Sequence, residues 1–274
     1  MKNSRVMPKA SVIVPTKNSA EFLEACLMSI RNQSYKNIEL IVVDNFSTDD
    51  TPKIAKKYAD KFLSKGPERT AQRNYATTKA KGEYIAFIDS DMEVGAKVIE
   101  QCVDASVKNV TGVIIHEKSF GPTFWAKCKA LEKSFYVNVP WIEAARFFPA
   151  PIFRKLNGYN ESLISGEDWD LSKRAEKLGS LVSIDEFIRH NEGNIKLIST
   201  LKKKYYYAKH AAAYLSANPE DSRLNSKVGP LNRYKLFFSQ PVKLFKNPII
   251  GIGMLYMKTS EFAFGAIGVI SGKI

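Results

Sequence analysis

The chain has 274 residues, of which 45% are hydrophobic and 25% charged, so it can bury a full core and is not intrinsically disordered. At roughly 150 residues per domain, this length indicates one large domain or one domain with an appendage. Three scattered cysteines are too few for a disulfide framework or a zinc site, and they favour a reduced, cytosolic compartment. The sequence shows no signal-peptide pattern and no run of about 18 uninterrupted apolar residues, so we expect neither secretion nor a polytopic membrane protein.

The net charge of +13 is distributed unevenly, with 41 Lys and Arg against 28 Asp and Glu. Residues 194–274 hold 13 basic and 3 acidic residues, which is most of the excess. The charge therefore predicts a nearly neutral domain over residues 1–193, followed over residues 194–274 by a basic appendage that meets an anionic surface.

Predicted strands and helices alternate along the first 115 residues. Short β-branched apolar runs predict strands at 10–14, 38–43, 84–88 and 110–115. Helical spacing of apolar residues predicts the intervening helices, at 20–31, 51–59, 68–80 and 97–108. This alternation predicts an α/β fold built on parallel strands with right-handed crossovers.

Polar residues follow three of the predicted strands, in the segments 15–18, 44–45 and 89–91. Ligands of such sheets bind beyond the carboxyl ends of the strands, so these segments define a candidate site. The glycine-rich signatures of dinucleotide and P-loop sites are absent from the sequence. A nucleotide bound here would need another way to neutralise its diphosphate, and Mg²⁺ or Mn²⁺ held by Asp89 and Asp91 supplies one.

Five ordered sequence blocks, which span about residues 10–190, resemble family 2 glycosyltransferases of the GT-A fold. They are residues 11–18, 41–49, 71–74, 82–92 and 166–171. The resemblance implies an α/β GT-A fold: a Rossmann-like mixed sheet flanked by helices, here with a basic and apolar C-terminal helical appendage. It also implies an inverting transferase that uses a nucleotide-diphosphate sugar, with UDP-sugars favoured.

The resemblance assigns most of the candidate donor site. The acid-x-acid motif implies that Asp91 binds a divalent cation, with Asp89 as a second ligand that also reaches the nucleotide-sugar. The remaining predicted donor contacts are Pro15, Thr16, Asn18, Asp44, Arg73 and Ser90. Simpler interpretations stay open: an acidic turn for residues 89–91, a turn residue for Asp44 and an exposed helix cation for Arg73.

The resemblance also assigns the chemistry at residues 166–171. Asp168 is the expected general base, since inversion requires a carboxylate to take the proton of the attacking acceptor hydroxyl. His190 is a candidate third metal ligand, and Glu167, Trp169 and Arg146 are candidates for the acceptor side, in a region that also holds Trp141. The alternatives are that Glu167, Asp168 and Asp170 are acids favoured at a helix N-terminus and that His190 is structural.

The last third of the chain combines a predicted helix at 195–216 with two apolar runs, 249–257 and 262–270, separated by Lys258 and Glu261. Each run is too short to span a bilayer. Amphipathic helices in the membrane interface, with Lys and Arg facing anionic headgroups, fit this pattern. The alternatives are a dimer interface or packing within the chain.

The sequence thus predicts an inverting, metal-dependent glycosyltransferase on the cytoplasmic face of the cell membrane, acting on a lipid-linked saccharide or a polyprenyl phosphate. A soluble enzyme with a polysaccharide or protein acceptor, whose C-terminal helices dimerise, is the first alternative. A nucleotidyltransferase or a basic nucleic-acid-binding protein is more distant. The sequence lacks the glycine-rich loop of a nucleotidyltransferase. Its basic excess accompanies apolar runs rather than a soluble basic groove, so we expect no nucleic acid partner.

Overall fold

The computed structural model describes residues 7–139, 142–217 and 229–272, and the chain divides into two compact units. The first unit consists of Met1–His116, Ala145–Glu161 and Leu171–Ile188. The second consists of Glu117–Ala144, Ser162–Asp170 and Arg189–Ile274. Each unit is therefore assembled from segments that lie far apart in the sequence.

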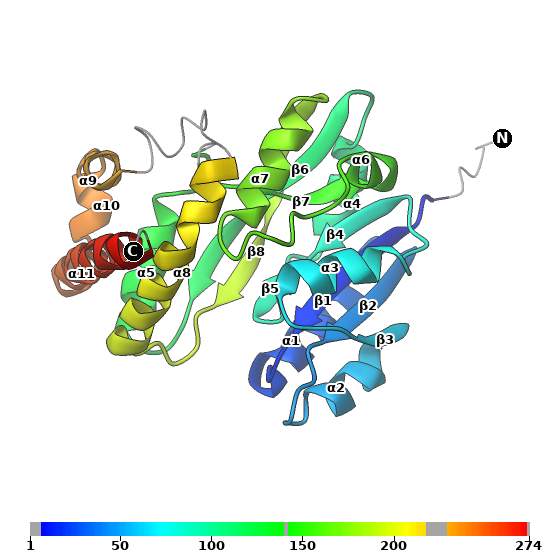
Figure 1. Cartoon of the computed structure of the whole chain (residues 1–274), viewed down its shortest axis with the longest axis horizontal. Helices are drawn as coiled ribbons and strands as arrows, with labels where there is room; N and C mark the ends of the chain where they lie inside the picture. Colours follow the sequence, from blue (N-terminus) through cyan, green and yellow to red (C-terminus); the bar gives the residue numbers. More distant parts are fainter. Residues whose placement is uncertain (1–6, 140–141, 218–228, 273–274) are drawn as a thin grey trace. The chain divides into compact units, whose positions relative to one another are not determined.

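Strands and helices alternate in the first half of the chain, and helices predominate towards its C-terminus (Figure 1). The strands are β1 (Ala10–Thr16), β2 (Ile38–Asp44), β3 (Lys61–Ser64), β4 (Tyr84–Phe87), β5 (Met92–Val94), β6 (Val110–Phe120), β7 (Ala145–Pro149) and β8 (Ser180–Asn191). The helices are α1 (Ala20–Arg31), α2 (Thr51–Tyr58), α3 (Arg69–Thr77), α4 (Val98–Ala105), α5 (Phe124–Ser134), α6 (Ala150–Lys155), α7 (Glu167–Glu176), α8 (Leu197–Ala217), α9 (Pro230–Phe238), α10 (Pro241–Phe245) and α11 (Pro248–Gly272).

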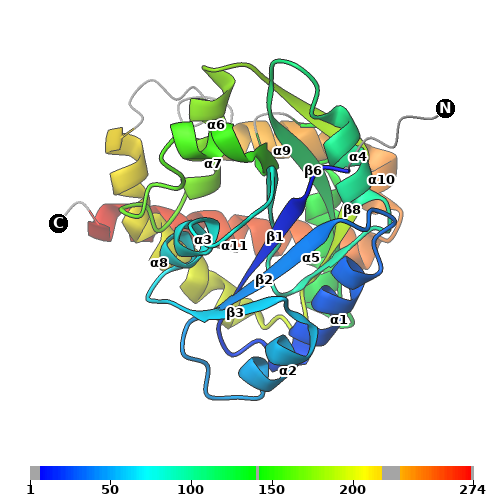
Figure 2. The same cartoon turned by 90° about the vertical axis from the view of Figure 1, so that its right-hand side faces the viewer.

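The strands form one mixed sheet in the order β3-β2-β1-β4-β7-β6-β8-β5. The strands β3, β2, β1 and β4 run parallel to one another, and Figure 2 shows β1, β2 and β3 side by side. β7 is antiparallel to both β4 and β6. All seven residues of β1 are buried, as expected for a central parallel strand covered on both faces.

Helices cover both faces of the sheet within the first unit. On one face, Val12 and Val42 pack in a cluster with Leu27 of α1 and residues of α2 and α4. On the other face, Ile13 and Phe87 pack with residues of α3, α6 and the last part of α7. Successive residues of a strand point to opposite faces, so the continuous apolar run of β1 supplies both layers. This packing fixes the carboxyl ends of β1, β2 and β4, from which the candidate site is built.

The second unit has its own core, to which α5, α9, α10 and α11 contribute. Phe135, Phe237, Leu244 and Met254 are buried in it. α11 packs along α8 and α5 (Figure 1). Close packing of α11 on α5 depends on Gly253, because a Cβ there would lie 2.5 Å from the Phe124 ring.

Four buried charges join α5 to α11, and we name Lys129, Glu132, Lys258 and Glu261 the α5–α11 quartet. Lys129 Nζ lies 2.8 Å from Glu132 Oε2 and 2.9 Å from Glu261 Oε1. Lys258 Nζ lies 2.6 Å from Glu132 Oε1 and 2.8 Å from Glu261 Oε2. Each ammonium thus contacts both carboxylates and each carboxylate both ammoniums, which offsets the cost of burying them.

The described elements differ from the sequence-based expectation in three ways. β3 and β5 were not predicted, because three or four residues are too few to show a period. β7 was not predicted either, and its Phe147 and Phe148 are completely buried in the core. The two apolar runs predicted at the C-terminus form a single 25-residue helix, α11, with Lys258 and Glu261 buried rather than at a break.

Candidate active site

The carboxyl ends of β1 and β2 are tied together by side chains. The buried hydroxyl of Thr16 donates to Asp44 Oδ1 at 3.0 Å, and the backbone N–H of Ser47 donates to Asp44 Oδ2 at 2.8 Å. Asn18 has a left-handed backbone with φ of 47°, and its Oδ1 accepts from the backbone N–H of Thr48 at 2.9 Å. Asp44 therefore orders two loops at the sheet edge, and Pro15 completes the end of β1 in the same place.

Helix α3 carries three consecutive polar residues that each contact a different segment of the first unit. Gln72 Nε2 donates to the carbonyls of Thr16 at 3.0 Å and Val43 at 2.7 Å, and so fastens α3 to the two strand ends. Asn74 exchanges hydrogen bonds of 2.9 Å with the backbone of Tyr159. Arg73 lies between them and is completely buried, with its guanidinium 5.1 Å from the centre of the Tyr159 ring.

Two guanidiniums hold the carboxylate of Asp89 directly after β4. Arg73 Nη2 donates to Asp89 Oδ1 at 2.7 Å, and Arg146 Nη1 lies 3.3 Å from Asp89 Oδ2. Burial by itself raises the pKa of Asp89, but the positive charges of Arg73 and Arg146 outweigh it and hold the pKa well below its usual range. Asp89 is therefore a carboxylate with a fixed orientation, and its side chain retains 19% exposure. We name Arg73, Asp89 and Arg146 the Asp89 cluster.

Ser90 and Asp91 continue this segment into a turn. The Ser90 hydroxyl donates to the Ser19 hydroxyl at 2.9 Å, which connects the turn to the residue before α1. Burial and the negative charges of Asp91 and Asp89 together raise the pKa of the Cys26 thiol, so this cysteine is a neutral, buried neighbour of both acids. The structure brings Arg73 and Arg146 onto Asp89 at the end of β4. Arg73 and Asp89 come from two of the sequence blocks, whereas Arg146, predicted for the acceptor side, lies outside them.

The donor set at this turn fits a hard divalent cation. Asp89 and Asp91 offer carboxylate oxygens, which suit Mg²⁺ or Mn²⁺. Among the described residues, no group of three or more His, Cys, Asp and Glu side chains gathers as a metal centre. Mg²⁺ typically binds through one or two carboxylates and completes its coordination with substrate phosphates and water.

The remaining predicted residues lie in the second unit. Gly166 has a left-handed backbone with φ of 81°, and α7 begins directly after it with Glu167 and Asp168. Glu167 is buried, while Asp168 is partly exposed. The Trp169 indole donates to the Ile142 carbonyl at 2.8 Å, which fixes the first turn of the helix. Trp141, a candidate for the acceptor side, lies outside the described residues.

His190 lies within strand β8, where it contacts the neighbouring strand β6. Its Nδ1 lies 3.4 Å from Glu117 Oε2, and Lys133 Nζ lies 3.6 Å from the same oxygen. A role for His190 as a metal ligand stays a prediction.

Comparison with known proteins identifies first the fold class and then the family. The mixed sheet and its helices have the GT-A fold. A mannosyltransferase from Pyrobaculum calidifontis, solved with GDP-Man and Mn²⁺, matches 96% of this chain and 87% of its own with a TM-score of 0.61 at 18% identity. Staphylococcus aureus TarS 1-349, solved with UDP-GlcNAc, matches 97% of this chain and 91% of its own with a TM-score of 0.54 at 17% identity.

The family is defined by the sequence itself. Residues 11–152 match the family described as glycosyl transferase family 2, and the chain therefore belongs to it. A GalNAc(5)-diNAcBac-PP-undecaprenol beta-1,3-glucosyltransferase from Campylobacter jejuni is 32% identical over 154 residues, which cover 52% of this chain and 49% of that enzyme. The chain spans about half or less of the length of the first curated relatives it matches.

Sequence reasoning missed the residues that position the site. Gln72 contacts the strand ends, and Tyr159 contacts Arg73. Neither residue carries charge, and only Gln72 falls inside a family block. Gly158 adds a further constraint, since a Cβ there would lie 2.5 Å from Asn74 Oδ1 at a φ of +68°. The Gly158-Tyr159 pair was a weak turn signal in the sequence, and only the fold shows that it faces α3.

Proposed function

We propose that this chain is an inverting, metal-dependent glycosyltransferase that moves a sugar from a nucleotide-diphosphate sugar to a membrane-associated acceptor. The observation that carries the proposal is the pair Asp89 and Asp91 at the carboxyl end of β4, in a chain of glycosyl transferase family 2. Two arginines hold Asp89, and Asp91 follows it on the same turn.

The donor is proposed to bind across the ends of β1, β2 and β4. Thr16 and Asp44 form the part of this edge that would meet the nucleoside, with Pro15, Asn18 and Ser90 around them. Asp91 would hold Mn²⁺ or Mg²⁺, with Asp89 as a second oxygen donor. When bound, the ion supplies positive charge that offsets the diphosphate. A UDP-sugar is the favoured donor, and the matched structures contain UDP-GlcNAc and GDP-Man.

Arg73 has a different role in this proposal from that of a direct donor contact. Its side chain is completely buried and donates to Asp89. It would therefore act by fixing the carboxylate, a task for which a planar guanidinium with several donors is suited. Arg146 contacts the other carboxylate oxygen and retains 13% side-chain exposure, so it remains the arginine for a direct contact on the acceptor side.

Asp168 is proposed as the general base. The acceptor hydroxyl oxygen attacks the anomeric carbon, its proton passes to the Asp168 carboxylate, and the bond to the diphosphate oxygen breaks with its electron pair leaving on the nucleotide. Attack from the face opposite the leaving group inverts the configuration. Glu167 and Trp169, in the same helical turn, would contact the acceptor, and His190 would support the metal or the diphosphate.

The acceptor is proposed to be a lipid-linked saccharide or a polyprenyl phosphate, reached from the cytoplasmic face of the membrane. Among the described residues, no helix has both the length and the apolar character needed to cross a bilayer. α10 and α11 nevertheless expose Val242, Ile249 and Ile252, each more than 60% exposed. The sequence has no acid from residue 229 to 260, so the charged residues of this stretch are all basic. An apolar, cationic surface suits peripheral attachment to anionic lipid.

The alternative function is transfer to a polysaccharide or protein acceptor by a soluble enzyme whose C-terminal helices dimerise, and the same exposed apolar face fits that arrangement. Family membership favours sugar transfer over nucleotidyl transfer or nucleic-acid binding. Sedimentation with anionic vesicles, compared with neutral vesicles and with the oligomeric state in solution, separates the two acceptor proposals.

Replacing Asp168 with Asn tests the proposed chemistry directly. Loss of a general base typically slows a reaction by about 10²–10⁴-fold. We therefore expect Asp168→Asn to lose transfer by that factor while donor affinity, measured by calorimetry with Mn²⁺, stays unchanged. An equal loss of donor affinity would assign Asp168 to the donor site, and unchanged transfer would remove it from the mechanism.

A further inference from the structure

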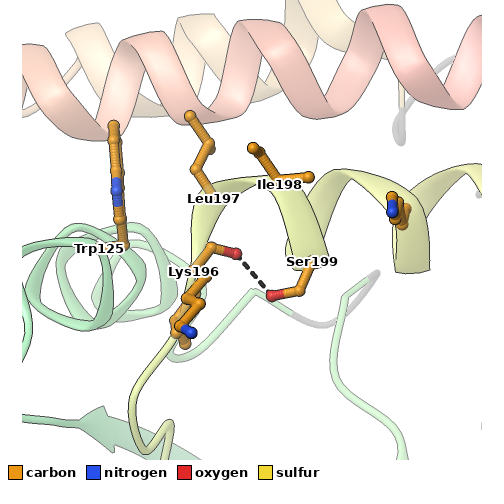
Figure 3. A pocket seen from close by; sticks show the side chains of 7 residues that line it. Trp125, Lys196, Leu197, Ile198 and Ser199 are labelled. Atoms are coloured by element: carbon orange, nitrogen blue, oxygen red, sulfur yellow. Dashed lines mark hydrogen bonds between the residues drawn. The ribbon is translucent and has the colours of Figure 1, made fainter.

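The second unit contains a cavity that the proposed mechanism does not use. It has a volume of about 580 Å³ and lies between the first turn of α5 and the first two turns of α8 (Figure 3). Trp125, Ile195, Leu197 and Ile198 contribute its apolar lining. The size is that of small-molecule sites, which measure about 300–1,000 Å³ and are lined mainly by hydrophobic and aromatic side chains.

The apolar wall is held in place by ring packing. The Trp125 ring lies 4.9 Å from the Phe124 ring, edge to face, and 6.3 Å from the ring of Tyr256 on α11. Ile198 lies on α8 and is 68% exposed, although it is a large aliphatic residue. A rigid aromatic wall opposite an exposed aliphatic side chain suits a flexible hydrocarbon ligand better than a polar one.

The two charged side chains that line this cavity are both positive. They are Lys196 and Lys202. The cavity also includes the start of α8, where the Lys196 carbonyl accepts from the backbone N–H of Thr200 at 3.1 Å. The N-terminus of a helix carries partial positive charge from its unsatisfied N–H groups, so α8 adds to the potential of the two lysines.

We propose that this cavity binds a phosphate-bearing lipid, with one hydrocarbon chain against Trp125 and Ile198 and the phosphate at Lys196 and Lys202. The apolar lining selects the chain, and the lysines select the anionic headgroup over a neutral one. The inference rests on the proposed function, because it assigns to the membrane-associated acceptor a defined site in the second unit.

Decyl phosphate, below its micelle concentration, is the first probe, and calorimetry measures its binding to the full chain. We expect decyl phosphate to bind saturably. Inorganic phosphate, which lacks the hydrocarbon chain, and decyl maltoside, which lacks the charge, should each bind at least tenfold more weakly. Binding of inorganic phosphate as tight as that of decyl phosphate would overturn the proposal of a lipid site.

Charge reversal locates the headgroup. The double variant Lys196→Glu/Lys202→Glu should weaken decyl phosphate binding at least tenfold. The matched control is Lys203→Glu/Lys209→Glu, since both lysines are exposed on the same helix and neither lines the cavity. Equal losses in both proteins would show attraction by the overall charge and would overturn the site.

Fluorescence quenching locates the hydrocarbon chain of the lipid without relying on a variant that binds poorly. Vesicles of phosphatidylcholine and phosphatidic acid with brominated acyl chains should quench the fluorescence of the wild-type protein more than that of Trp125→Phe. Equal quenching would place the chain elsewhere. Binding of a UDP-sugar with Mn²⁺, measured on the same samples, tests the proposed function separately, because the donor-site residues are unchanged in all of these variants.

Discussion

The α5–α11 quartet and the Asp89 cluster are built on opposite plans. In the α5–α11 quartet, two lysines and two glutamates contact one another in a closed arrangement, and Glu132 and Glu261 are at most 2% exposed. In the Asp89 cluster, two arginines converge on one carboxylate that stays 19% exposed at the end of β4. The quartet is almost fully buried, whereas the Asp89 cluster is partly exposed at the sheet edge where the donor is proposed to bind.

This difference separates a structural role from a functional one. A balanced set of buried charges needs no further partner, and removing one member leaves the others uncompensated. A carboxylate that is ionised, fixed in orientation and partly exposed suits a site that binds a diphosphate and a cation together. Substitutions in the quartet should therefore change stability, and substitutions at the end of β4 should change activity.

Asp91→Asn should give the largest effect on activity. The amide keeps the size of the side chain but removes the charge proposed to hold the divalent ion, so we expect no detectable transfer and weaker Mn²⁺-dependent nucleotide binding. Thermal unfolding should stay nearly unchanged. Transfer assays with Mn²⁺ and with EDTA measure this prediction, and full activity of the wild-type protein in EDTA would contradict the metal requirement.

Glu132→Gln should give the largest effect on stability. It leaves Lys129 and Lys258 with one carboxylate between them, and breaking a buried ion pair on one side costs about 3–5 kcal/mol. Urea unfolding measures the loss, and donor binding by the molecules that remain folded should be preserved.

The exposed pair of Lys57 and Glu24 provides the matched control for that experiment. These two side chains are 64% and 49% exposed at a separation of 2.9 Å, and exposed ion pairs contribute little. Glu24→Gln should therefore leave the urea midpoint where it is in the wild-type protein. Equal shifts for Glu132→Gln and Glu24→Gln would show that the quartet does not stabilise the second unit.

Much of the first unit was predictable because its signals are local. The helical period of apolar residues gave α1 its observed bounds of Ala20–Arg31, and buried β-branched runs located β1, β2 and β4. The strand ends follow from these positions, so the grouping of Thr16, Asp44 and Asp89 at one sheet edge was also within reach. The mixed GT-A sheet was predicted through the family resemblance, because the sequence pattern by itself indicated parallel strands.

The partners of buried charges were not predictable, because they are set by packing between segments far apart in the chain. Arg73 has the sequence character of an exposed helix cation, and only the fold shows it buried against Asp89. Lys258 and Glu261 resembled a polar break between two apolar runs, whereas Lys129 and Glu132 of α5 neutralise them within one continuous helix. Residue type gives the charge but not the distance to its partner.

The smallest expected effect is the pH dependence of stability, and it tests both clusters together. Burial raises the pKa values of Glu132 and Glu261, but the ammonium groups of Lys129 and Lys258 outweigh it and hold both pKa values below normal, as the two arginines do for Asp89. A carboxyl group with a lowered pKa in the folded state stabilises the protein above its unfolded pKa of about 4, and this contribution is lost as the pH falls.

At the basic end, burial lowers the pKa of Lys129, but Glu132 and Glu261 raise it to about 12, so its contribution is lost only as the pH rises towards that value. We therefore expect the free energy of unfolding, measured with urea, to be nearly level from about pH 6 to 7 and to fall below about pH 5. Asp89→Asn and Glu261→Gln should each show a shallower fall between pH 5 and 3 than the wild-type protein, because each removes one of the carboxyl groups that take up protons on unfolding. Identical slopes in all three proteins would mean that other carboxyl groups determine the acid sensitivity, and that neither cluster holds its acids ionised in the folded state.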